Sequence, residues 1–239
     1  MLISSLTLGF LIGMQHAIQA DHVAAVASIA AGKRGVRSIV RQGVVWGIGH
    51  TVTLLIVGGV CLFMAKSVPD SAANLLESVV GVMLMGLGGH LLYRVWRDRV
   101  HFHSHRHAPT DVHIHAHSHR GDAQPHSRSA HQHEHPSGLP WRTFVVGLVH
   151  GMAGSAALIV LTAATLESPW WGVAYILIFG LGSVAGMALL SCIIAVPLTL
   201  TASALTVANR ALQVVVGMAT AAIGLHILVE RAPSLLAVI

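Results

Sequence analysis

Apolar residues occur along this chain in six long runs, separated by short linkers and by one long polar segment. The runs cover residues 6–30, 43–65, 72–95, 144–166, 170–196 and 208–229. Each is long enough to cross a hydrocarbon core of about 30 Å, which takes roughly 20 helical residues. None of them alternates between polar and apolar positions as the strands of a membrane barrel do. The pattern predicts an all-α integral membrane protein with six transmembrane helices.

The composition agrees with burial in lipid. Of the 239 residues, 54% are hydrophobic and only 10% are charged, whereas about 25% charged residues are usual in a soluble domain. The net charge is +5, but the basic residues lie between the apolar runs and at their ends. We therefore expect the lipid bilayer, and no nucleic acid, as a partner.

Basic residues are distributed unevenly among the linkers. Residues 32–41 carry four Lys and Arg side chains, whereas residues 67–71 and 167–169 carry none. Because Lys and Arg accumulate on the cytoplasmic side of a membrane, this predicts that both termini lie outside. The expected location is the cytoplasmic (inner) membrane, as a multi-pass protein.

The two halves of the chain resemble each other at an offset of about 134 residues. The segment GMQHAIQADH from Gly13 aligns with GLVHGMAGSA from Gly147, and GIGHT in the second run falls near GLGSV in the fifth. Three helices per half is an odd number, so the second half must insert upside down. This predicts a 3+3 inverted repeat, which is typical of secondary transporters. The repeats would be residues 1–96 and 141–239.

Residues 97–140 separate the repeats and are rich in histidine. Twelve of the eighteen histidines lie between His101 and His135. Such a tract is too polar to pack a core, which predicts a cytoplasmic His-rich loop. Neutral imidazoles at alternate positions can bind divalent metal. The loop histidines expected to contact metal are His101, His103, His105, His107, His113, His115, His117, His119, His131, His133 and His135.

Ionisable residues also occur inside the apolar runs. His16, Asp21 and His22 fall in the first run and His50 in the second. A charged group at bilayer depth costs roughly 2.5–3.5 kcal/mol, so it normally faces a partner or a polar cavity. At about 100° per residue, one regular helix cannot direct all the polar groups of the first run to one point. Either this helix unwinds locally, or Asp21 orients an imidazole from outside the ligand set.

We interpret His16, Asp21, His22 and His50 as a pathway for a divalent cation. Imidazole and carboxylate ligands suit nickel, cobalt, zinc or copper better than calcium or magnesium. The repeat adds His150, which corresponds to His16. Secondary positions are Gln19, His90 and His226. The sequence contains no GxxxxGK[ST] loop, so neither ATP hydrolysis by this chain nor an ATPase subunit is indicated.

The residues His16, Asp21 and His22 resemble the first signature of the nickel/cobalt transporter family, H-x4-D-H, and Gly49-His50-Thr51 resembles its second. The six-run layout and the His-rich loop are similar to its urease-accessory, UreH-type branch. The resemblance implies a non-enzymatic permease that takes up Ni²⁺, or Co²⁺, for urease or hydrogenase maturation. It also implies no permanently bound cofactor and a cytoplasmic nickel chaperone as recipient.

Three alternatives remain open at this stage. Relatives of similar architecture expel these metals, so efflux is the first. Cys61 and Cys192 fall in corresponding runs of the two halves, which would suit a membrane thiol-disulfide electron carrier. A membrane metalloenzyme is the third, and it would need a general base near an open metal position.

Overall fold

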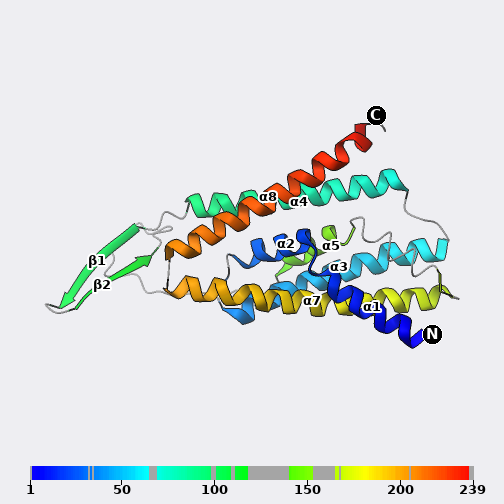
Figure 1. Ribbon diagram of the computed structural model, residues 1–239, viewed down its shortest axis with the longest axis horizontal. Helices are drawn as coiled ribbons and strands as arrows, with labels where there is room; N and C mark the ends of the chain where they lie inside the picture. The colour runs from blue at the N-terminus through cyan, green and yellow to red at the C-terminus, as the bar shows by residue number, and fades with distance from the viewer. Residues whose placement is uncertain are drawn as a thin grey trace.

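The computed structural model describes residues 2–31, 33, 35–64, 69–97, 101–108, 111–117, 140–152, 165–166, 168–204 and 206–236. Helices occupy the apolar runs, and a two-stranded hairpin lies between the halves (Figure 1). The elements are α1 (Leu2–His16), α2 (Ala20–Ala30), α3 (Val36–Met64), α4 (Asp70–Arg97), β1 (His101–Ala108), β2 (Asp111–His117), α5 (Trp141–His150), α7 (Pro169–Ala204) and α8 (Thr206–Leu236).

Among the described residues, four helices, α3, α4, α7 and α8, are long and apolar enough to cross a membrane. They match the second, third, fifth and sixth predicted spans, and the chain is a multi-pass membrane protein. The first predicted span, residues 6–30, is divided between α1 and the 11-residue helix α2. The fourth begins with α5, but its residues 153–164 lie outside the described residues.

The long helices pack in pairs, α3 beside α7 and α4 beside α8 (Figure 1). Both pairs are antiparallel and meet at glycines. A Cβ on Gly81 would lie 2.9 Å from the Gly224 carbonyl oxygen, and one on Gly88 would lie 2.6 Å from the Gly217 carbonyl oxygen. Such contacts let two backbones approach closely without side chains between them.

The sequence repeat makes the two contacts between α4 and α8 equivalent to each other. In the third run of each half the repeat has an offset of 136, which places Gly81 on Gly217 and Gly88 on Gly224, so it exchanges these two contacts. The pair α3 and α7 behaves in the same way, since Gly47 lies against Val184 and Gly180 lies against Thr51. Helices α1 and α5 are related in the same way. Each packs against a long helix of the other half, α1 against α7 and α5 against α3.

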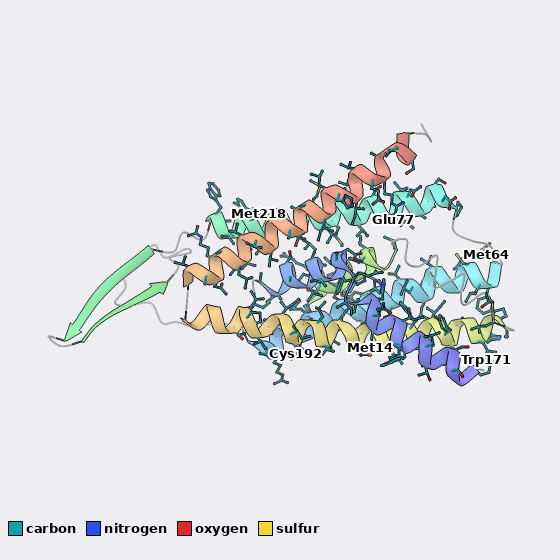
Figure 2. All side chains as sticks on the ribbon, viewed as in Figure 1. Met14, Met64, Glu77, Trp171, Cys192 and Met218 are labelled. Atoms are coloured by element: carbon teal, nitrogen blue, oxygen red, sulfur yellow. The ribbon has the colours of Figure 1, made fainter. Side chains whose placement is uncertain are left out.

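Arginines of α8 bind α4 near both ends of their contact. Arg231 pairs with Glu77, and Figure 2 shows Glu77 where α8 crosses α4. At the other end the Arg210 guanidinium donates a hydrogen bond of 3.0 Å to the Val95 carbonyl oxygen. Long side chains of this kind reach the membrane interface from helix ends.

The His-rich segment corrects the expectation of a chain without strands. β1 and β2 pair antiparallel, with His101 opposite His117, His103 opposite His115 and His105 opposite His113. Histidine at every second position has the period of a strand, which explains why this tract can pair. His119, His131, His133 and His135 lie outside the described residues. The hairpin extends from one end of the helical body, and both termini lie at the other end (Figure 1).

Candidate metal centre

The candidate centre lies where the first apolar run breaks. α1 ends at His16, α2 begins at Ala20, and Gln19 between them has an extended backbone (φ −63°, ψ 149°). The break places Asp21 and His22 in the first turn of α2, where the helix dipole favours a negative charge. Of the two arrangements expected from the sequence, local unwinding is therefore observed.

Asp21 joins the two halves of the chain through imidazoles. Its Oδ1 lies 3.0 Å from Nδ1 of His22 and accepts the His22 backbone N–H at 2.9 Å. Its Oδ2 lies 3.0 Å from Nε2 of His150, which is the last residue of α5. The Asp21 side chain is 25% exposed, whereas both imidazoles are 1% exposed. Asp21 thus also has the second role considered from the sequence, that of orienting imidazoles.

His50 brings α3 to the same point. Its Nε2 lies 3.3 Å from Nε2 of His16, and its ring centroid lies 5.2 Å from that of His22. The rings of His16 and His22 are 4.3 Å apart. One potential ligand atom from each of these three histidines lies within 4.8 Å of the others, and Asp21, His22 and His150 form a second such group.

Several imidazole nitrogens here are buried and have no hydrogen-bond partner among the described residues. They are Nε2 of His22, Nδ1 of His50 and Nδ1 of His150. For His22 and His150, the other ring nitrogen faces Asp21, so a ring N–H there can donate to the carboxylate. The free nitrogen then carries a lone pair, as in the carboxylate–histidine–metal arrangement of many metal sites. Buried polar atoms normally have partners, so unpaired nitrogens at one point indicate a place for a ligand.

The five primary positions predicted from the sequence, His16, Asp21, His22, His50 and His150, therefore lie together. Of the secondary positions, Gln19 contacts the centre, because its side chain, although exposed at the start of α2, hydrogen-bonds His16. His90 and His226 do not join the centre and are exposed on α4 and α8. His226 lies 4.0 Å from Glu230, one turn further along α8. Side-chain contacts of the hairpin histidines are outside what the structure describes.

The sequence analysis did not single out Trp46, which packs against the centre. Its ring centroid lies 5.2 Å from that of His22 and 5.1 Å from that of His150. Trp46 is fully buried, and its Nε1–H has no partner in the part of the chain that the structure describes. Its position one helical turn before His50 is a signal that could have drawn attention to it.

Cys61 and Cys192 lie far from each other. α3 and α7 run antiparallel with Gly43 beside Ser191, so Cys192 lies near the start of α3 and Cys61 near its end. About 20 residues of helix separate these levels, which corresponds to roughly 30 Å. Figure 2 shows Cys192 well removed along the molecule from Met64, which follows Cys61 closely in the chain. A disulfide needs Cα atoms about 5.5 Å apart, so the two thiols cannot pair in this arrangement.

The helical fold and the buried histidines define a multi-pass membrane protein with an ionisable centre at a broken helix. Comparison with known families is more specific. The chain belongs to the family described as cytochrome C biogenesis protein transmembrane region, whose model matches residues 6–226. It is also similar to the urease accessory protein UreH of Bacillus sp. (strain TB-90), with 35% identity over 230 residues, covering 94% of this chain and 90% of that protein. No solved structure matches the chain.

Proposed function

We propose that this protein is a secondary permease that takes up Ni²⁺, or Co²⁺, across the cytoplasmic membrane. The observation that carries the proposal is the meeting of His16, Asp21, His22, His50 and His150 at one buried point. Ionisable residues inside a membrane protein are expensive, and they commonly mark the path of an ion. Imidazole with one carboxylate favours a transition metal over calcium or magnesium.

In this proposal the imidazoles replace part of the water around the ion. His16, His22 and His50 come from both sides of the helix break and from α3, so small movements of these elements would change the number of ligands. Asp21 holds the rings of His22 and His150 in place and balances part of the positive charge. The transported ion is the substrate, and the protein needs no resident cofactor.

We further propose that the chain is built as a 3+3 inverted repeat around this centre. The exchange of glycine contacts between α4 and α8, and between α3 and α7, supports this symmetry. Binding sites in such repeats lie near the membrane midplane, often where a helix is interrupted. His16 is repeated as His150, but the other ligands are not, and Ser183 stands where the first half has His50. The proposed site is therefore asymmetric.

Uptake is the direction that we propose. The similar protein from Bacillus is described as a urease accessory protein, which suggests delivery of metal to an enzyme through a cytoplasmic nickel chaperone. With the hairpin and the basic linkers facing the cytoplasm, the membrane potential would pull the ion inward. A divalent cation gains about 4.6 kcal/mol on entering at −100 mV, so the potential alone could drive uptake.

The test is accumulation of radiolabelled nickel, at trace concentration, in cells that produce the wild-type chain or the double variant His16→Ala, His22→Ala. His226→Ala is the matched control, because that exposed histidine lies outside the centre. If the protein takes up nickel, cells that produce the wild type or the control will contain more nickel than cells that produce the double variant. Lower content with the wild type would mean efflux. If neither the nickel content nor the cobalt content differs among the strains, metal transport is refuted.

The family description favours a second candidate, a thiol-disulfide electron carrier, since cytochrome c biogenesis is in its name. Electron transfer through Cys61 and Cys192 would need the two thiols to meet, and the packing of α3 against α7 keeps them apart. A Cys61→Ala, Cys192→Ala variant separates the two functions. The permease retains nickel uptake in this variant, whereas a thiol carrier loses its activity.

A further inference from the structure

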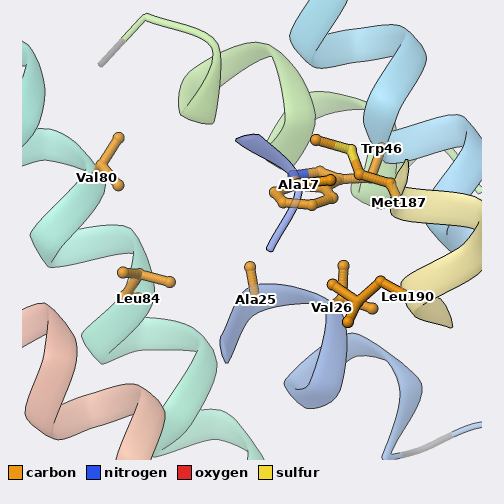
Figure 3. Packing of buried hydrophobic residues seen from close by; sticks show 8 residues of the cluster. All are labelled: Ala17, Ala25, Val26, Trp46, Val80, Leu84, Met187 and Leu190. Carbon is orange, nitrogen blue, oxygen red and sulfur yellow. The ribbon is translucent and has the colours of Figure 1, made fainter. Parts of the chain in front are cut away.

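The side of the histidine cluster that faces the basic linker is covered by one aromatic ring. α2 ends and α3 begins near residues 31–36. On each helix, one side chain lies one turn away from the candidate ligand, on the side nearer to these residues. These side chains are Val26 after His22 and Trp46 before His50. Both are buried in one apolar cluster. Figure 3 shows the Trp46 ring close to Ala17 and Met187, with Val26 and Leu190 beside it.

Beyond Trp46 a narrow hollow continues between α2 and α3. It is lined by Val26, Ile29, Ile39, Gln42, Gly43 and Trp46. The hollow is too narrow to hold a water molecule, so the described residues that line it leave no open path through it. Ile29 is only half-buried, which places this end of the hollow near the surface.

Polar atoms of several helices surround this closed passage. The Gln42 Oε1 accepts a hydrogen bond from Thr143 of α5. The Ser191 hydroxyl of α7 points at Gly43, where a side chain would collide with it, and it has no hydrogen-bond partner among the described residues. Buried hydroxyl and amide groups in an apolar helix interface are costly unless they serve a partner or a path.

We propose that Trp46 is the gate on the basic side of the centre, and that the hollow lined by Gln42 is the path between the centre and that side. This inference rests on the proposed transport of metal. The indole offers only an N–H donor and no lone pair to coordinate a metal ion, so the ring blocks the path and is not a ligand. Among the described residues, no hydrogen bond to the indole N–H holds the ring in place. Gly43 and Gly47 flank Trp46 on α3, and at both positions the backbone lies against α7.

The test measures access to the path in the full-length chain, reconstituted in liposomes. Cys61→Ala and Cys192→Ala remove the native thiols, and Gln42→Cys adds a reporter in the hollow. A small, membrane-impermeant thiol reagent is applied on the basic side, and the labelling rate is compared among four chains. These carry Trp46, Trp46→Phe, Trp46→Ala and the matched control Trp170→Ala, in which an exposed tryptophan is replaced.

The gate predicts slow labelling with Trp46 and with Trp170→Ala, labelling several-fold faster with Trp46→Ala, and an intermediate rate with Trp46→Phe. If Trp46→Ala does not insert in the membrane, Trp46→Phe decides, because phenylalanine is a smaller ring in the same place. Equal rates with and without the indole would overturn the gate. Nickel uptake by the parent chain in the same liposomes keeps the two ideas apart. Uptake with equal labelling rates refutes only the gate, and absence of uptake refutes the permease.

Discussion

The Oδ2 atom of Asp21 lies 3.0 Å from Nε2 of His150, although 129 residues separate them in the chain. This contact ties the start of α2 to the end of α5, and so it ties the first half of the protein to the second. The other oxygen of the same carboxylate is used by His22. A single side chain therefore sets the orientation of two imidazoles from different halves.

Asp21→Asn is expected to weaken nickel binding by about 10- to 100-fold, the usual cost of losing a carboxylate behind a metal-binding imidazole. The amide keeps one acceptor oxygen, but its NH₂ group would meet the second imidazole in place of an acceptor. Equilibrium binding of radiolabelled nickel to the purified protein measures the effect. Asp70→Asn, an exposed carboxylate at the start of α4, is the control. Equal affinity in both variants would show that Asp21 does not orient these rings.

His50→Ser is expected to lower the initial rate of nickel uptake at trace concentration by about tenfold or more, because one of three converging imidazoles is lost. Ser183 occupies the equivalent place in the second half and is fully buried, so a hydroxyl fits this kind of helix contact. The variant should therefore insert normally, and its amount in the membrane is measured beside uptake. A rate equal to that of the wild type would exclude His50 from the path.

Gly49→Ala is expected to destabilise the protein by about 1–3 kcal/mol, the usual cost of overpacking. A Cβ on Gly49 would collide with the Phe144 carbonyl oxygen of α5, and backbone cannot move aside easily. Gly59 on the same helix has open space at its Cβ position, so Gly59→Ala is the matched control. Thermal unfolding in detergent compares the two variants. Similar midpoints would mean that α3 and α5 do not pack as closely as described.

The sequence was sufficient to find the centre because ionisable residues stand out in apolar runs. His16, Asp21, His22 and His50 are conspicuous for this reason, and the repeat added His150. The break between α1 and α2 could be suspected from the helical positions of these residues, but not located. Residues 17–19 include neither Gly nor Pro. The bend depends on contacts with distant parts of the chain, such as the one between Asp21 and α5.

Other features lay beyond what a pattern can indicate. Trp46 is one more apolar residue in an apolar run until its neighbours in space are known. His90 and His226 match each other in the repeat, but so do the glycines around them, and the close contact of α4 with α8 accounts for that similarity. The hairpin was missed because a tract too polar to pack a core was taken to be a loop, although its histidines alternate.

Replacing residues 101–117 by a Gly-Ser linker of equal length tests the hairpin. The long helices pack against one another without it, so we expect unchanged folding and an unchanged maximal rate of nickel uptake. At trace nickel we expect uptake to fall by about tenfold or more, because histidines tethered near the entrance or exit raise the local concentration of metal. The dependence of the uptake rate on nickel concentration distinguishes the cases. Identical curves would show that the hairpin takes no part, whereas a lower maximal rate would place it in the transport path itself.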